Sequence, residues 1–462
     1  MSAKIELVFI PCPGSGHLVS MVEMAKVLVN RDGRLSVTVL IMKFRFNSEI
    51  DSHIGLLTAS VADRIRFVLL PRRSHSPRTS FFAFVYHFME SYKADLREAI
   101  AELSAQGSPR LAGLVLDVFC TSMIDVAVEF GVPSYIFFPS GAAFLGVTLH
   151  LQSLRDEQHM DPSRLKGSDA VLDLPCLANP LPAAKFLPLE VFLEEDCRIF
   201  LDIPLRYRET NGILVNTFAE LEPHAVEALA SLGASTVYSV GPILNINVES
   251  KKGFEIVDWL DQQPDASVVF LCFGKIAYAL ERSRYRFLWS LRQPPAKGEL
   301  EAPQDYANLA EVLPEGFLNR TAGVGRVIGW APQVTILAHP AIGGFVSHCE
   351  WNSTLESIWF GMPVAAWPQY AEQHFNAFHL VVELGLAAEI KMDYRRDLVT
   401  GSDDVVMANE IERGIRKLME GEEAREKRKK VKEVSEKSRK ALMEGGSSYL
   451  SLSRFIEDVC NQ

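Results

Sequence analysis

Short runs of almost fully apolar, often β-branched residues recur along the whole chain, and stretches with helical spacing separate them. Strands that are apolar on both faces and alternate with helices are typical of parallel sheets covered on both sides. The pattern therefore predicts an α/β, doubly wound fold. The runs of the first half include IELVFIP, LSVTVLIM, LAGLVLD and SYIFF, and those of the second half include SVVFLCF, YRFLWSLR, IGGFVSH and MPVAAWP.

Two such folds are expected in one chain. With 462 residues, of which 48% are hydrophobic, the chain exceeds the size of one ordinary domain. Residues 242–253 are polar and aperiodic, which favours a linker between Rossmann-like domains at residues 1–241 and 254–446. Ligands of such folds bind outside the carboxyl ends of the strands. Because many enzyme classes share this outline, the fold alone does not predict the function.

Composition and missing motifs disfavour several classes of function. The net charge of −11 argues against nucleic-acid binding, and seven dispersed cysteines indicate thiols in a reducing, cytoplasmic compartment. Residues 130–154 carry no Asp, Glu, Lys or Arg, but Pro133 and Pro139 break the run, so we expect strand, turn and buried helix there instead of a membrane span. No G-x-G-x-x-G, P-loop, D-x-D or H-E-x-x-H motif occurs, so neither a cofactor nor a metal site is predicted.

Two polar residues follow predicted strands of the first half. His17 comes after the first strand, before a helix expected to begin near Leu18, and Asp117 ends the strand LAGLVLD. Because parallel strands share their carboxyl edge, His17 could act as a general base that Asp117 orients and stabilises. The alternatives are a helix-capping or structural histidine and an aspartate that caps the next helix.

The second half contains a strand, a turn and a helix start in FVSHCEWNSTLES, residues 345–357. This arrangement presents backbone N–H groups to an anion such as a phosphate. It lies within WAPQVTILAHPAIGGFVSHCEWNSTLESIWFGMPVAAWPQYAEQ, residues 330–373, which closely resembles the signature segment of plant family 1 UDP-glycosyltransferases. PGSGHL, GILVNTFAELE, VGPI and GGSS resemble the same family elsewhere in the chain.

The resemblance implies the GT-B architecture, with an acceptor-binding first domain, a UDP-sugar-binding second domain and a final helix at residues 447–462 that crosses back to the first. It implies UDP-glucose as co-substrate, no bound cofactor or metal, and a monomer. His17 and Asp117 match the family's base and its partner. Trp330 would stack on uracil and Ala331 would bind its edge.

The remaining donor contacts are also implied by the resemblance. Gln333 and Glu356 would bind the ribose hydroxyls, since a carboxylate accepts two hydrogen bonds. His348 would donate to the diphosphate beside the helix N-terminus. Glu372 and Gln373 would hold the sugar, a pair that in this family indicates glucose. The predicted donor site thus comprises Trp330, Ala331, Gln333, His348, Trp351, Asn352, Ser353, Glu356, Glu372 and Gln373.

Three positions depart from the family pattern. Glu350 stands where the pattern has glycine, and its carboxylate would compete with the substrate's phosphates. After Gly274 a Ser/Gly-rich loop that contacts the phosphates is missing, although Lys275 could supply a charge there. Pro139 replaces a hydroxyl residue near the sugar. Together they predict an impaired enzyme, a truncated product or a deliberate variant.

The predicted function is inverting transfer of glucose from UDP-glucose to a hydroxyl of a small apolar acceptor. The aromatic stretches FFAFVYHF (residues 81–88) and FFPSGAAF (residues 137–144) fit flavonoid, phenolic or terpenoid acceptors, but they fit a plain core as well. A catalytically inactive protein that binds a nucleotide or small molecule is the alternative from another class. A Rossmann oxidoreductase is a weaker one, because the dinucleotide fingerprint is missing.

Overall fold

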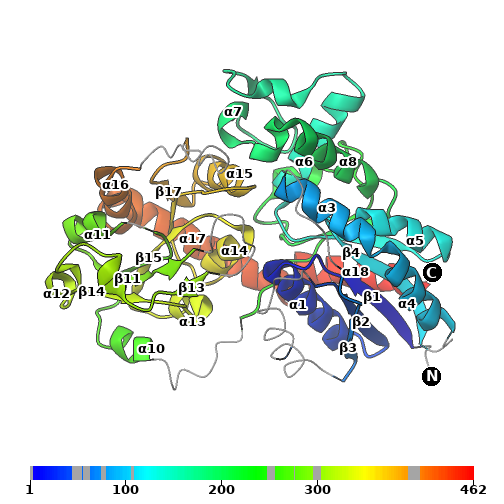
Figure 1. Cartoon of the computed structure of the whole chain (residues 1–462), viewed down its shortest axis with the longest axis horizontal. Helices are drawn as coiled ribbons and strands as arrows, with labels where there is room; N and C mark the ends of the chain where they lie inside the picture. The colour runs from blue at the N-terminus through cyan, green and yellow to red at the C-terminus, as the bar shows by residue number, and fades with distance from the viewer. Residues whose placement is uncertain are drawn as a thin grey trace. The chain divides into compact units, whose positions relative to one another are not determined.

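The chain forms two compact units, each built on a parallel sheet with flanking helices, which confirms the predicted α/β class (Figure 1). The computed structural model describes residues 4–43, 55, 63–73, 80–105, 109–246, 255–274, 276–294, 303–393 and 406–461. The first unit holds residues 1–180, 189–245 and 440–462. The second holds residues 181–188 and 246–439.

The first unit contains a seven-stranded sheet in the order β3-β2-β1-β4-β5-β8-β9. Its registered neighbours are all parallel. The strand order reverses between β1 and β4, and this is the switch point where doubly wound sheets open a ligand crevice. The strands are β1 (Ile5–Ile10), β2 (Leu35–Ile41), β3 (Ile65–Leu69), β4 (Arg110–Asp117), β5 (Ser134–Phe138), β8 (Gly212–Val215) and β9 (Val237–Ser239); the short β6 spans Val171–Leu172.

Helix α1 (Ser15–Arg31) and the last helix, α18 (Ser447–Asn461), share the apolar core of this sheet. In α18 the buried side chains recur at helical spacing along one face, and Phe455 meets Tyr135 of β5 edge to face, 5.0 Å between ring centroids. The other helices of the unit are α3 (Phe81–Ser91), α4 (Lys93–Ala105), α5 (Ile124–Glu129), α6 (Ala142–Asp156), α8 (Glu194–Tyr207) and α9 (Pro223–Ala228).

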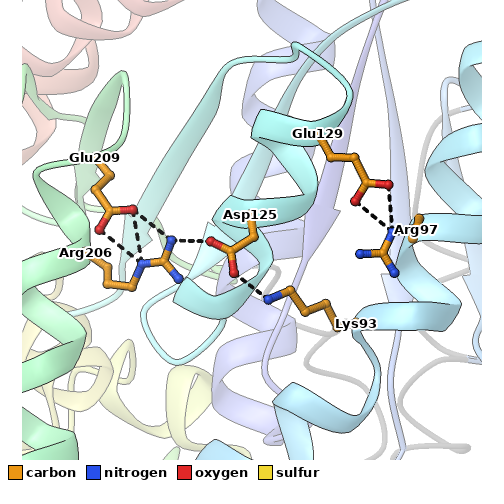
Figure 2. A network of polar contacts seen from close by, with 6 residues as sticks. All are labelled: Lys93, Arg97, Asp125, Glu129, Arg206 and Glu209. Carbon is orange, nitrogen blue, oxygen red and sulfur yellow. Dashed lines mark hydrogen bonds and ion pairs between the residues drawn. The ribbon is translucent and has the colours of Figure 1, made fainter.

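A network of ion pairs joins α4, α5 and α8 on the surface of the first unit (Figure 2). Asp125 accepts from Arg206 at 2.6 Å and also pairs with Lys93, while Arg97 binds Glu129 at 2.7 Å. Exposed pairs of this kind contribute about 0–1 kcal/mol each. The network therefore adds little to the free energy of unfolding.

The second unit contains a six-stranded sheet in the order β14-β11-β10-β15-β16-β17, again parallel. A Cβ on Gly344 of β15 would lie 2.5 Å from Leu418, so glycine permits the close approach of α16. The strands of the second unit are β7 (Leu181–Pro182), β10 (Val268–Leu271), β11 (Arg286–Ser290), β12 (Arg292–Gln293), β13 (Gln304–Asp305), β14 (Gly325–Ile328), β15 (Ile342–Ser347), β16 (Val364–Ala366) and β17 (Ala387–Glu389). Its helices are α7 (Ala183–Phe186), α10 (Glu255–Leu260), α11 (Ala277–Ser283), α12 (Phe317–Thr321), α13 (Gln333–Leu337), α14 (Trp351–Trp359), α15 (Gln373–Phe378), α16 (Ala408–Met419) and α17 (Gly421–Leu442), whose last residues lie in the first unit.

The uncharged stretch of residues 130–154 folds as β5, a turn and most of the buried α6, as predicted. Across the described ranges, no helix combines the length and the apolar character that a membrane crossing requires. All seven cysteines are free thiols, and five of them are buried. Of the predicted linker, residues 247–253 lie outside the described part of the chain.

Candidate functional site

The switch point of the first sheet brings His17 and Asp117 together, although 100 residues separate them in the sequence. β1 and β4 are neighbours with Ile10 opposite Leu116, so the segments that follow them start side by side. His17 Nδ1 lies 2.7 Å from Asp117 Oδ2. Asp117 Oδ1 accepts a hydrogen bond from the backbone N–H of Phe119 at 3.1 Å, which holds the carboxylate in place.

The two side chains differ in exposure: Asp117 is fully buried, whereas the imidazole of His17 is 30% exposed. When Nδ1–H donates to the carboxylate, the neutral tautomer carries its lone pair on Nε2. Burial raises the pKa values of Cys12, Cys120 and Tyr207 well above their ordinary range, and the negative charge of Asp117 raises them further. These three neighbours thus stay uncharged beside the carboxylate.

The predicted position of His17 needs a correction. α1 begins at Ser15, three residues earlier than expected, so His17 lies in the first turn of the helix and not before it. Gly14 is the residue before the helix and has extended backbone angles. His17 is therefore held by regular helical structure and not by a loop.

Aromatic rings continue from His17 along the first unit, and sequence analysis singled out only some of them. The ring of Phe119 lies 5.5 Å from that of His17, and Phe82 meets Phe119 edge to face at 5.6 Å. Phe84 and Phe88, from the same stretch as Phe82, are buried in the core. The stretch 81–88 therefore contributes both a partly exposed ring, Phe82, and rings of the core. Phe119 had a signal in the sequence, because it comes two residues after a strand-end aspartate.

In the second unit, the predicted nucleoside residues lie after β14 and on α14. Trp330 follows β14 and is 55% exposed, as a stacking platform must be. Gln333 Nε2 donates to Glu356 Oε2 at 2.7 Å and to Ser353 Oγ at 3.0 Å. Burial raises the pKa of Glu356 to about 7; the hydrogen bond from Gln333 opposes the rise and the charge of Glu350 adds to it.

The turn between β15 and α14 carries His348 and Glu350. His348 Nε2 lies 3.0 Å from Glu350 Oε2, and Glu350 makes no hydrogen bond that caps the helix. The backbone of the turn is held by Asn376, whose Nδ2 donates to the carbonyl of Cys349 at 2.9 Å. The strained position is Cys349, with φ of 66°, whereas Glu350 has φ of −60°, which any residue adopts. The departure from glycine therefore changes the site and not the local fold.

The other predicted donor residues lie at or just before the first turns of α13, α14 and α15. Gln373 is almost fully buried, and its Oε1 accepts from the backbone N–H groups of Gln369 and Tyr370. Glu372 directly precedes α15 and is partly exposed. The indole of Trp351 is only 2% exposed and lies parallel to the ring of His379, so the structure gives this side chain a packing role. Ala331 and Asn352 are partly exposed beside Trp330 and Trp351.

The connection after β10 is as short as the sequence indicates, with α11 beginning at Ala277. Phe273 anchors the start of this connection. Its ring stacks on Trp367 with 4.6 Å between centroids, and its carbonyl accepts a hydrogen bond from Trp289 Nε1 at 2.8 Å. A Cβ added at Gly274 would meet no atom of the described residues within 4 Å. Lys275 lies outside the described residues. Within the described ranges, no cluster of three His, Cys, Asp or Glu side chains could hold a metal ion.

Comparison with known proteins decides the family. UDP-glucose flavonoid 3-O-glucosyltransferase 6 of Fragaria ananassa is 52% identical, with 99% of each chain covered. The chain belongs to the plant family 1 UDP-glycosyltransferases. UDP-glycosyltransferase 71E1 of Stevia rebaudiana is also 52% identical, over 99% of this chain and 98% of the relative. The family model for UDP-glucoronosyl and UDP-glucosyl transferase matches residues 273–418 of this glycosyltransferase.

Solved structures agree with this glycosyltransferase over its whole length. A transferase from Siraitia grosvenorii in complex with UDP is 50% identical with a TM-score of 0.86, covering 99% of this chain and 100% of the other. Medicago truncatula UGT71G1 complexed with UDP-glucose is 39% identical with a TM-score of 0.86, covering 99% and 98%. These matches confirm the GT-B fold, the family and the enzyme class. The alignment with the strawberry enzyme spans 487 positions, more than the 462 residues here, so that relative has residues that this chain lacks.

Proposed function

We propose that this chain transfers glucose from UDP-glucose to a hydroxyl of a small apolar acceptor, with inversion at the anomeric carbon. The observation that carries the proposal is the His17–Asp117 pair at the switch point of the first sheet, 2.7 Å between Nδ1 and Oδ2. A His held in this way has the geometry of a general base. The relatives named for flavonoid glucosyltransfer and the solved complexes with UDP and UDP-glucose support the choice of substrates.

In the proposed mechanism, Nε2 of His17 removes the proton of the acceptor hydroxyl while its oxygen attacks the anomeric carbon. The glycosidic bond to UDP breaks on the opposite face, and UDP leaves with the electron pair. Asp117 stabilises the imidazolium that forms, because its buried carboxylate lies against Nδ1–H. Phe119 and Phe82, beside His17, fit an aromatic acceptor such as a flavonoid or another phenolic, and a terpenoid would pack on the same rings.

We assign the donor to the second unit and the acceptor to the first. Trp330 supplies the exposed ring for uracil, and Gln333 with Glu356 forms the hydrogen-bonded pair for the ribose. His348, Asn352 and Ser353 stand at the start of α14 for the diphosphate. Glu372 and Gln373 would bind the sugar hydroxyls. Gln373 would donate from its amide NH₂ group, because its Oε1 already accepts from the backbone of Gln369 and Tyr370.

We further propose that this activity is lower than that of the relatives. Glu350 stands next to His348, and the sequence after Gly274 omits the Ser/Gly-rich loop that in the family pattern supplies donors to the phosphates. The same two features favour a second candidate, a catalytically inactive protein that binds the nucleotide. The free thiols support a cytoplasmic location.

The test is a turnover assay next to a binding titration. Purified protein is incubated with UDP-glucose and a panel of flavonoid, phenolic and terpenoid acceptors, and products are detected by mass spectrometry. The anomeric configuration of the product is read from its NMR coupling constant. A β-glucoside from at least one acceptor supports the first candidate, whereas UDP binding without any product supports the second.

A further inference from the structure

We propose that Glu350 is a selectivity residue: its carboxylate contacts Nε2 of His348 and so weakens binding of the diphosphate, while binding of the uridine is unchanged. This inference rests on the proposed function, since it takes the turn between β15 and α14 as the place of the diphosphate. It goes further by dividing the donor site into a part that Glu350 affects and a part that it does not.

The contact between the two side chains carries the inference. Glu350 Oε2 lies 3.0 Å from His348 Nε2, with the carboxylate 43% exposed and the imidazole 24% exposed. Both residues lie between Ser347, where β15 ends, and Trp351, where α14 begins. One imidazole N–H makes one good hydrogen bond, so a phosphate oxygen and the Glu350 carboxylate compete for it. A diphosphate must displace the carboxylate before it can use His348.

The charge of Glu350 adds to this competition. Glu350 directly precedes α14, and the helix dipole favours an anion at a helix N-terminus. The same charge is among the causes that raise the pKa values of Glu356 and Tyr370, so its field reaches across this edge of the sheet. A diphosphate that enters therefore meets like charge in a place where its own charge would otherwise be stabilised.

The uridine contacts depend on other groups. Trp330 would stack on the base without any charge, and Gln333 is positioned by Glu356 and Ser353. Neither contact involves His348. The structure thus separates the two halves of UDP: the nucleoside is held by stacking and hydrogen bonds, and the diphosphate by the turn that Glu350 occupies. The measurable quantity is the ratio of the UDP and uridine affinities.

The experiment measures uridine and UDP affinity by calorimetry for the wild-type protein, Glu350→Gly and Glu350→Gln. A pH of 8 keeps Glu356, with its pKa of about 7, mostly ionised in every variant. In Glu350→Gly the ratio of UDP to uridine affinity should rise about 5- to 30-fold at low salt, the upper range for a charge at a helix N-terminus, and fall as salt increases. Glu350→Gln keeps the size, removes the charge and should give a smaller rise.

The matched control is Glu422→Gln, which makes the same change of charge on the exposed first turn of α17. It should leave the ratio unchanged. An equal ratio in wild type and Glu350→Gly, or an equal gain for uridine and UDP, would overturn the inference. If Glu350→Gly does not fold, as judged by its thermal unfolding, Glu350→Gln decides by the same criterion. Folded variants that bind neither ligand would overturn the donor site itself, whereas uridine binding with an unchanged ratio would overturn only the role of Glu350.

Discussion

Each unit of this glycosyltransferase places a histidine and a carboxylate together at the carboxyl edge of its sheet, and the two pairs have opposite consequences. In the first unit Asp117 is fully buried and engages Nδ1 of His17 at 2.7 Å. In the second unit Glu350 is 43% exposed and engages Nε2 of His348 at 3.0 Å. The two distances are similar. The pairs differ in which imidazole nitrogen the carboxylate contacts and in how far the carboxylate is buried.

A carboxylate behind Nδ1 orients the ring and stabilises the imidazolium, which is the arrangement of a general base. A carboxylate on Nε2, exposed where a ligand would approach, competes with that ligand instead. A histidine–carboxylate contact therefore has no fixed chemical role. Its role depends on burial and on the position of the second nitrogen. Three substitutions and one loop insertion test the two sites further, in addition to the substitutions of Glu350.

The largest effect is expected at His17. His17→Ala should lower the rate of glucose transfer by about 10²–10⁴-fold, the usual contribution of a general base, and leave UDP affinity unchanged. Initial rates and calorimetry on the same preparations measure both quantities. A variant with full activity would remove His17 from the mechanism, and a parallel loss of UDP affinity would make it a structural residue.

The next effect concerns the short connection of the second unit. A Ser/Gly-rich insertion after Gly274 should raise turnover by up to about 10²-fold, because a single donor to a developing negative charge is worth about 10²–10³ in kcat. Glu350→Gly alone should improve donor affinity more than turnover, since removing a repulsion does not supply missing donors. Initial rates and UDP affinity of the parent, each variant and the combination separate the two losses. A parent that already turns over at the rate of its relatives would refute the impairment.

Trp330 tests the uncharged part of the donor site. Trp330→Ala should weaken UDP and uridine binding alike by about 1–3 kcal/mol, the range for stacking a base on an aromatic ring. Titration of both ligands, with Trp359→Phe as a control, measures the loss. Unchanged affinities would show that Trp330 is a surface residue, and a loss confined to UDP would contradict the division of the site.

The smallest effect is a pH dependence of stability. Glu356 has a pKa of about 7 in the folded protein against an ordinary value of 4.5, so the folded state binds the additional proton between these values. Its contribution to stability is therefore complete below about pH 4.5 and is lost as the pH rises through 7. Glu356→Gln should raise the Tm relative to wild type by about 2–4 °C more at pH 8 than at pH 5. Thermal unfolding at both pH values checks this, and an equal difference would contradict the raised pKa.

Much of the fold followed from local pattern. The apolar runs became strands within one or two residues of their expected positions, because each contains enough buried side chains to define its element. Element ends were less certain, as the earlier start of α1 shows. The sequence could not tell which rings of the stretch 81–88 lie near His17 and which lie in the core. Aromatic side chains on one helix point in several directions, and their residue type does not show which of them are buried.

The sequence by itself determined the parallel sheets, the family and the positions of His17, Asp117, His348 and Glu350 at strand ends. Only the tertiary structure decided what each histidine binds. Asp117 reaches Nδ1 of His17 across 100 residues because β4 lies beside β1, and strand order is a property of the whole sheet. Glu350 is two residues from His348, and its carboxylate lies against Nε2 in a turn whose backbone Asn376 holds from another helix. Local pattern identifies the groups, and packing between distant segments sets their orientation.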